Sequence, residues 1–194
     1  MSTASRTRAR ILDAAVRRIA REGIDEVRIA RIATDAGVSP ALVHYHFDSR
    51  EALLVEALEH SYELAGSARA AAAEDGPATA RLAAMIDGCL PLPGEQRDDW
   101  LLWVELWLRA ARHPELAGTA GRLYARLHEW FEEVLAEGVA AGEFAATDTA
   151  RLTDRLLAAI DGYGLRALIG DPAVPVDRAR TEVWALAAEA LGLG

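Results

Sequence analysis

The sequence has few of the features that mark disulfide-stabilised, membrane-spanning or disordered chains. It contains one cysteine, Cys89, which excludes a disulfide framework within the chain. It has no apolar run of the roughly 18–20 residues that cross a membrane. The apolar residues near the N-terminus are interrupted by Asp13, Arg17 and Arg18, which is not the pattern of a signal peptide. With 52% hydrophobic and 26% charged residues, the composition is that of a cytoplasmic globular protein with no membrane partner.

Lysine is also absent, and the arginines that replace it are distributed unevenly against the acids. Residues 1–50 carry nine arginines and six acidic residues, a net charge of +3. The rest of the chain carries twelve arginines and twenty-four acidic residues, a net charge of −12. A basic N-terminal part on an acidic body indicates a polyanionic partner for the N-terminal part only.

Strand patterns of alternating β-branched residues are missing as well, and almost the whole chain has the composition and periodicity of helices. Glycine, proline and capping residues divide it into about nine helices. Asp148 opens one of them, and Asp177 can cap the last. The sequence therefore predicts an all-α fold with helices at about 7–22, 28–36, 40–47, 49–73, 77–90, around Trp100 and ending before His113, 116–141, 148–169 and 177–191.

The segment AGVSPALVHYHF, residues 36–47, predicts two short helices joined by a tight turn. Gly37 suits the left-handed position that follows a helix, Ser39 is a good N-cap, and Pro40 fits a first helical turn. Only about three residues separate the two helices, which is typical of a helix-turn-helix motif. In such motifs the second helix enters the major groove of DNA with its N-terminal residues.

The polar aromatic run His44-Tyr45-His46 suggests a metal site or acid–base chemistry, but helical geometry argues against both. Residues i and i+2 lie about 200° apart around a helix, so His44 and His46 cannot hold one metal from one helix. An enzyme that uses His44, His46, His113 or His128 stays an alternative, although no nucleophile–base spacing or phosphate loop supports it. The sequence therefore predicts no catalytic residue, no metal site and no cofactor.

Residues 5–65 resemble the DNA-binding domain of the tetracycline-repressor (TetR) family of transcriptional regulators. The motifs that carry the resemblance are ILDAA, REG, IARIATDAGVSPALVHYHF and SREALLVEAL, in this order. Residues 66–194 include a tryptophan-rich helix, AAGEF and AAIDGYGL, which are similar to the ligand-binding domain of the choline-sensing repressor branch. The resemblance implies a helix-turn-helix domain over 5–65, with its motif at about 28–47, and a helical ligand-binding and dimerisation domain over 66–194.

The resemblance also implies roles for individual residues of the motif. Three residues approach base edges, namely Pro40, Ala41 and His44. Leu42 and Tyr45 lie near the DNA backbone, and His46 and Arg50 fall at phosphate-contacting positions. Arg28 and Ser39 begin the two helices, where N–H groups attract phosphates. The chain departs from the family pattern at His44, Ala41 and Arg28, where the family usually has Tyr, a Gly or small polar residue, and Thr.

The basic residues near the motif are candidates for phosphate neutralisation, which makes DNA affinity fall with salt. They are Arg6, Arg8, Arg10, Arg28, Arg31 and Arg50.

The last two helices each carry an apolar stripe that is suited to a homodimer interface of four helices. The interface candidates are Leu156, Ile160, Gly164, Leu168, Val183, Trp184 and Leu191. The alternative is that these stripes pack inside one subunit.

The helix with Trp100, Trp103 and Trp107 is the candidate ligand pocket, since the spacing of three and four residues places the three indoles on one face. The alternative is a core stripe. Asp161 falls inside an apolar arc, and a buried carboxylate needs a partner, which could be an arginine, a helix N-terminus, Tyr163 of a neighbour or a cationic ligand. Indoles with a carboxylate favour an ammonium compound through cation–π contact; a neutral hydrophobic ligand is the alternative.

These observations together predict a ligand-responsive DNA-binding transcriptional regulator that is not an enzyme. We expect a repressor that binds a palindromic double-stranded DNA operator as a homodimer and is released by a small organic effector. The alternatives are an activator, a DNA-binding regulator without a small ligand, and the small helical enzyme.

Overall fold

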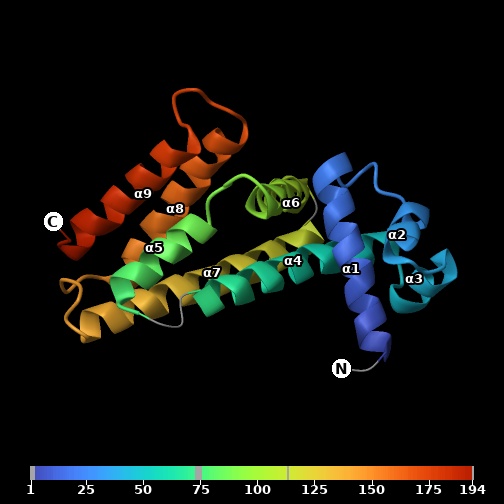
Figure 1. Cartoon of the computed structure of the whole chain (residues 1–194), viewed down its shortest axis with the longest axis horizontal. Helices are drawn as coiled ribbons and strands as arrows, with labels where there is room; N and C mark the ends of the chain where they lie inside the picture. The colour runs from blue at the N-terminus through green and yellow to red at the C-terminus, as the bar shows by residue number, and fades with distance from the viewer. Residues whose placement is uncertain (1–2, 73–75, 113, 194) are drawn as a thin grey trace. The chain divides into compact units, whose positions relative to one another are not determined.

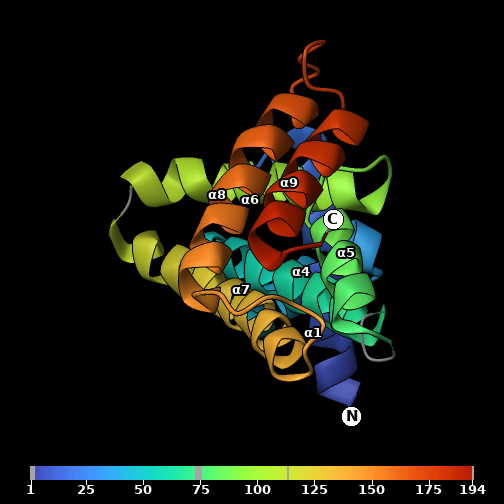
Figure 2. The same ribbon diagram turned by 90° about the vertical axis from the view of Figure 1, so that its left-hand side faces the viewer.

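The computed structural model describes residues 3–72, 76–112 and 114–193 of the chain. These residues form nine helices and no strand (Figures 1 and 2). The helices are α1 (Thr3–Glu22), α2 (Ile29–Ala36), α3 (Pro40–His46), α4 (Arg50–Ala72), α5 (Ala78–Gly88), α6 (Glu95–Arg112), α7 (Pro114–Ala140), α8 (Thr149–Leu168) and α9 (Val176–Leu191). The all-α fold predicted from the sequence is confirmed. None of the helices found in the described segments is long and apolar enough to cross a membrane.

The chain divides into two compact units, and the division does not follow chain order. The first unit contains Met1–Ala65 and Leu101–Ala120, and the second contains Gly66–Trp100 and Gly121–Gly194. The predicted domain boundary at residue 65 coincides with one of these limits. The C-terminal part of α6, however, groups with the N-terminal helices.

The first unit has a core formed by the apolar faces of the N-terminal helices. Its buried residues include Ile11, Leu12, Ala15 and Ile19 of α1, Ile32, Ala33 and Ala36 of α2, Val43 of α3, Phe47, and Leu53, Leu54 and Ala57 of α4. Helix α2 packs against both α1 and α3. This packing leaves the outer face of α3 free of the core.

The turn between α2 and α3 has the conformation that the sequence predicts. Gly37 adopts the left-handed conformation with φ 63°, and the Val38 N–H donates to the Ala33 carbonyl at 2.9 Å. The Ser39 hydroxyl accepts a hydrogen bond from the Leu42 N–H at 3.2 Å and caps α3, whose first residue is Pro40. These local interactions end one helix and start the next within three residues.

The second unit has α8 and α9 packed side by side, with α5 against α9 (Figure 1). Asp148 caps α8 by accepting from the Arg151 N–H at 3.0 Å, as predicted. The prediction that Asp177 caps α9 is wrong, because α9 starts at Val176 and Pro175 occupies the N-cap position. Asp177 lies in the first turn, where its charge still favours the helix dipole.

Candidate nucleic-acid interface and ligand site

Helix α3 presents most of its side chains to solvent. Val43 is its buried residue, and Phe47 anchors the chain directly after it. Tyr45 is 80% exposed, and His46 is half-buried with its ring edge-on to Tyr45 at a centroid distance of 5.3 Å. The exposed residues are Pro40, Ala41, Leu42, His44 and Tyr45. The structure therefore brings the predicted base- and backbone-contacting residues of α3 onto one accessible surface.

The start of α2 also faces solvent and carries a cation. Arg28 is exposed and occupies the N-cap position in an extended conformation, with no side-chain hydrogen bond to the helix. The first N–H groups of α2 consequently have no capping side chain. A helix N-terminus with an adjacent arginine attracts an anion such as a phosphate.

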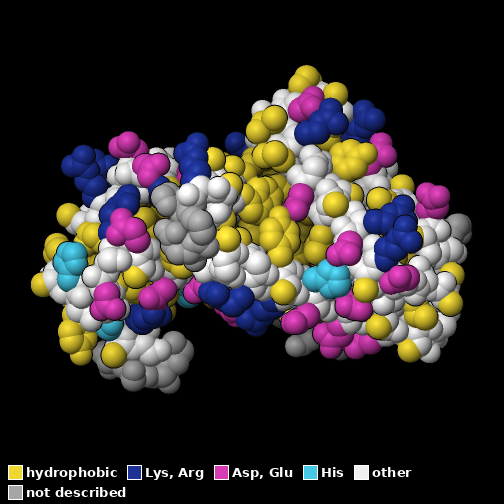
Figure 3. Space-filling view, turned by 180° about the vertical axis from the view of Figure 1, so that it is seen from behind, with side chains coloured by type: hydrophobic (Ala, Val, Ile, Leu, Met, Phe, Trp, Pro, Cys, Tyr) yellow, Lys and Arg dark blue, Asp and Glu magenta, His cyan; other side chains and the backbone are white. Residues whose placement is uncertain are grey.

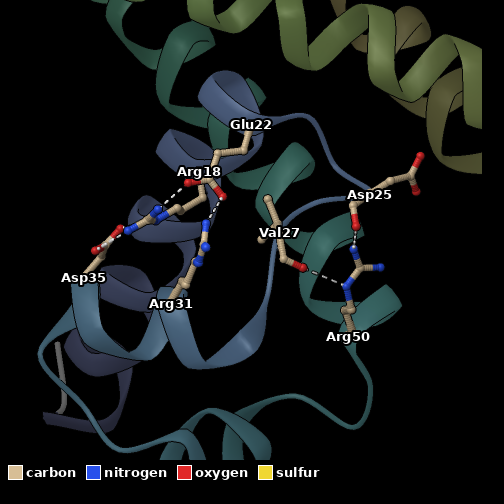
Figure 4. A network of polar contacts seen from close by, with 7 residues as sticks. All are labelled: Arg18, Glu22, Asp25, Val27, Arg31, Asp35 and Arg50. Carbon is tan, nitrogen blue, oxygen red and sulfur yellow. Dashed lines mark hydrogen bonds and ion pairs between the residues drawn. The ribbon is translucent and has the colours of Figure 1, made fainter.

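Arg50 differs from Arg28 in that its guanidinium is hydrogen-bonded within the protein. Its guanidinium donates to the backbone carbonyls of Val27 at 3.0 Å and Asp25 at 3.2 Å (Figure 4), and also to that of Ile24 at 2.6 Å. All three carbonyls belong to the loop between α1 and α2. A phosphate contact by Arg50 stays a prediction, and in this structure its guanidinium N–H groups donate to protein carbonyls.

Four charged residues connect α1 with α2 in a network on the same unit (Figure 4). Arg18 donates to both oxygens of Asp35, at 2.6 and 2.9 Å, and pairs with Glu22, which also lies 3.3 Å from Arg31. The hydrogen bond from Arg18 lowers the pKa of the Asp35 carboxyl, and the same two carboxylates raise the pKa of Arg18. The network fixes α2 on α1, and Arg31 is one of its members.

Two further arginines that the sequence offers as phosphate contacts have partners inside the unit. Arg8 pairs with Glu56 and lies over the Phe47 ring at 5.1 Å from the centroid. Arg10 donates to the Ala36 carbonyl at the end of α2. Arg6, Arg8 and Arg10 are all exposed.

Helix α6 places its tryptophans in separate environments. Trp103 packs edge-on against Tyr62 of α4 at a centroid distance of 5.4 Å, and Trp107 lies 6.0 Å from Trp103. This aromatic cluster, Tyr62, Trp103 and Trp107, belongs to the first unit. Tyr62 could not be identified from the sequence, because its contact with Trp103 of α6 joins residues 41 positions apart.

Trp100 belongs to the second unit and is buried. Its indole N–H donates to the Cys89 carbonyl at 3.1 Å, and its ring lies directly over Gly164. A Cβ at Gly164 would meet Trp100 Cζ2 at 2.2 Å. The glycine in α8 thus permits close packing of an indole within the subunit.

Asp161 lies in an open groove of about 570 Å³ between α7 and α8. Its carboxylate accepts a hydrogen bond from the Tyr124 hydroxyl at 2.7 Å. Desolvation raises the pKa of Asp161, and the Tyr124 hydrogen bond opposes that rise. The groove is lined by Tyr124, Ala125, His128, Glu129, Asp154, Leu157, Ala158 and Asp161. The partner of this carboxylate is therefore Tyr124 of α7, which is not among the candidates that the sequence suggested.

The dimer-interface candidates are already buried within the second unit, with one exception. Six of them contribute to its core, namely Leu156, Ile160, Gly164, Leu168, Val183 and Leu191, and Trp184 is half-buried. Packing inside one subunit was the alternative reading of these stripes. Hydrophobic side chains also lie among charged ones on the surface (Figure 3), and Leu165 of α8 and Ile169, its C-cap, are exposed.

Of the four histidines considered for enzyme chemistry, three lie in the part of the chain that the structure describes, and these three do not form a catalytic group. His44 and His46 lie on α3, and His128 lies 3.5 Å from Glu132 and 3.3 Å from Asp154 in the second unit. His113 lies outside the described residues.

Comparison with known protein families gives two matches that together cover most of the chain. Residues 11–57 match the family model described as bacterial regulatory proteins, tetR family. Residues 77–192 match the model described as BetI-type transcriptional repressor, C-terminal.

Individual relatives are similar over nearly the whole chain. The HTH-type transcriptional regulator BetI of Brucella anthropi is 30% identical over 165 residues, which cover 84% of this chain and 82% of that protein. A putative transcriptional regulator from Saccharomonospora viridis, solved in complex with choline, is 34% identical with a TM-score of 0.83, covering 95% of this chain and 96% of that one. A putative TetR-family regulator from Rhodococcus sp. is 26% identical with a TM-score of 0.85, covering 96% and 99%.

Proposed function

Because the chain belongs to the TetR family of transcriptional regulators, with a BetI-type C-terminal region, we propose that it is a ligand-responsive transcriptional repressor. It binds a palindromic operator as a homodimer in the cytoplasm, and a small cationic effector releases it. The observation that carries the proposal is the accessible face of α3, whose buried Val43 packs into the core of the first unit, within a chain of this family.

The proposed DNA contacts divide into base-reading and backbone-positioning residues. Pro40, Ala41 and His44 face the base edges of the major groove, and Leu42 and Tyr45 lie along the backbone. His46 and Arg28 contact phosphates, with help from the N-terminal N–H groups that Arg28 and Ser39 precede. One helix of seven residues offers few base contacts, so two copies are needed for specific binding.

The proposed dimer uses the outward faces of α8 and α9, because their inward faces are already occupied within the subunit. On α8 the outward positions Ala158, Gly162, Leu165 and Ile169 follow one another at intervals of four, three and four residues. Small residues at the first two positions allow close approach of a partner helix, and Leu165 and Ile169 supply apolar area. In a dimer with two-fold symmetry, this face of one subunit contacts the same face of its partner.

The proposed effector is a quaternary ammonium compound of the choline type. The Saccharomonospora viridis regulator, similar over almost the whole chain, was solved with choline. In this chain the aromatic cluster Tyr62, Trp103 and Trp107 offers π faces for a cation. A separate candidate is the carboxylate of Asp161, which lies in a groove within the second unit.

Isothermal titration calorimetry with a matched ligand pair tests the effector proposal. Choline and 3,3-dimethylbutan-1-ol have nearly the same shape, but a neutral carbon replaces the ammonium nitrogen in the second compound. We expect choline to bind and the alcohol to bind at least about tenfold more weakly, since only the cation gains cation–π attraction. Equal binding of both compounds would indicate a neutral hydrophobic pocket. If neither compound gave heat, the proposal of a choline-type effector would be refuted.

Variants locate the site. Trp103→Leu and Trp107→Leu should weaken choline binding by about tenfold or more, because each loses a cation–π face. Trp130→Leu on α7 is the matched control, since Trp130 pairs with Arg126 outside the cluster and should leave affinity unchanged. Asp161→Asn keeps the shape of the side chain and tests whether its charge contributes. Loss of affinity in the control alone would exclude the aromatic cluster.

A further inference from the structure

We infer that Arg50 acts in DNA binding as a positioning residue, which holds the loop 23–28 and thereby the start of α2. This inference rests on the proposed DNA-binding function. Arg50 is the first residue of α4, and its Nε and one terminal nitrogen donate to the carbonyls of Ile24, Asp25 and Val27 at 2.6 to 3.2 Å. Figure 4 shows the contacts with Asp25 and Val27.

The carbonyls of Ile24 and Val27 need these donors because the loop has no helical neighbours to supply them. The side chains of Ile24 and Val27 are buried, at 2% and 1% exposure, so the loop is pressed onto the core. A backbone carbonyl held against a core without a partner is costly. Charge-assisted bonds from a guanidinium are about twice as strong as neutral ones, and one planar group reaches all three acceptors.

The contacts of Arg50 connect the two ends of the segment that contains α2 and α3. Arg50 follows Phe47, the C-cap of α3, by three residues, and Val27 directly precedes Arg28, the N-cap of α2. The hydrogen bond from Arg50 to Val27 therefore joins the two ends of the segment that contains α2 and α3. Arg10 of α1 holds the corner between these helices through the Ala36 carbonyl.

A direct phosphate contact would compete with this arrangement. The Nε and one terminal nitrogen of Arg50 are used by the loop, and the other terminal nitrogen lies 3.6 Å from Glu51. Arg28 has no such partners among the described residues and is exposed. The structure thus gives the two arginines different tasks: Arg28 meets the DNA, and Arg50 sets where Arg28 and the α2 terminus lie.

Salt dependence of operator binding separates the two tasks, measured by fluorescence anisotropy on the dimeric protein. Each phosphate contact adds about 0.9 to the slope of log affinity against log salt. We expect Arg50→Met to lower operator affinity by about tenfold and to reduce the slope by about 0.9 per protomer, because Arg28 then loses its phosphate contact. Arg50→Lys should restore neither the affinity nor the slope, since a single ammonium keeps the charge but not the planar fork. The control pair differs in its rescue: Arg28→Met should also reduce the slope by about 0.9 per protomer, but Arg28→Lys should recover it.

A double-mutant comparison tests whether Arg50 acts through Arg28. In an Arg28→Met background, Arg50→Met should cost less than about threefold in affinity, because the group that it positions is gone. Additive losses would mean that Arg50 stabilises the unit generally, and they would overturn the positioning role. If Arg50→Met loses its helical circular dichroism signal, Arg50→Gln takes its place, because its amide can still donate to one carbonyl.

Amide hydrogen exchange on the DNA-free protein gives a readout that does not depend on the proposed function. The amides of Arg31 and Ile32, which donate to the Arg28 carbonyl, should exchange about tenfold faster in Arg50→Met, whereas that of Phe47 should not change. Unchanged exchange at Arg31 and Ile32 would overturn the inference. So would a reduced salt slope in Arg50→Met that Arg50→Lys restores, since that result identifies a phosphate contact. Absence of any DNA binding by the wild-type chain would instead refute the proposed function and leave the exchange result to decide on the loop contacts.

Discussion

Substituting Gly164 by Ala tests the packing of α8 against Trp100. A Cβ at this position would lie 2.2 Å from Cζ2 and 2.3 Å from Cη2 of the indole. Carbon atoms pack best at about 3.5–4.0 Å, so the ring or the helix must move by more than about 1 Å. Trp100 cannot rotate freely, because its N–H is bonded to the Cys89 carbonyl and its ring is buried.

The expected magnitude follows from three terms. Overpacking of a filled core costs about 1–3 kcal/mol, and loss of the indole hydrogen bond would add about 1 kcal/mol. Alanine in a helix interior regains about 0.5–1 kcal/mol relative to glycine. We therefore expect a net destabilisation of about 2 kcal/mol, which for a chain of this length lowers Tm by about 4–8 °C.

Urea unfolding followed by circular dichroism, at one fixed protein concentration because dimers gain stability with concentration, measures this change. Gly121→Ala in α7 is the matched control, since an added Cβ there meets no atom within 4 Å. It should stabilise the protein by about 0.5–1 kcal/mol. If Gly164→Ala were as stable as Gly121→Ala, the close approach of Trp100 to α8 would be refuted.

Three further predictions concern charge, DNA reading and assembly. Desolvation raises the Asp161 pKa above 3.8, so the ionised carboxylate destabilises the folded protein at neutral pH. Asp161→Asn should therefore be more stable than wild type at pH 7, and this advantage should shrink as the pH falls towards 4. Thermal unfolding at several pH values measures the difference. His44→Ala should change the sequences selected from random DNA, whereas His46→Ala should lower affinity for all sequences by a similar factor of about three to ten; equal losses on every sequence for both variants would refute this division. Ile169→Glu, which replaces a 71% exposed apolar residue, should produce monomers in sedimentation and weaken operator binding at least tenfold; a stable dimer would move the interface away from this end of α8.

Local signals in the sequence predicted the helices well, because they depend on neighbouring residues. The left-handed turn at Gly37, the cap at Ser39 and the cap at Asp148 all follow from contacts within four residues. The cap assigned to Asp177 failed for the same local reason, since Pro175 two residues earlier already occupies the boundary.

Contacts between residues of different helices could not be predicted from the sequence. Spacing placed Trp100, Trp103 and Trp107 on one face, but it could not show that the first packs on Gly164 and the second on Tyr62. Similarly, positive charge suggested a phosphate contact for Arg50, whereas its hydrogen-bond acceptors are carbonyls 23 to 26 residues away.

The apolar stripes of α8 and α9 show the same limit, because periodicity identifies a buried face without saying whether the neighbour belongs to the same subunit. The structure fills the inward stripe from within the subunit, through residues such as Val183 and Leu156. A dimer must then use the outward face.

The most direct test of ligand-controlled DNA binding is the affinity of the wild-type chain for its selected operator, measured by fluorescence anisotropy with and without saturating choline. The proposed mechanism predicts specific binding that choline weakens by at least about tenfold, a coupling free energy of about 1.4 kcal/mol or more, and that 3,3-dimethylbutan-1-ol leaves unchanged. An operator affinity that is the same at every choline concentration would contradict it.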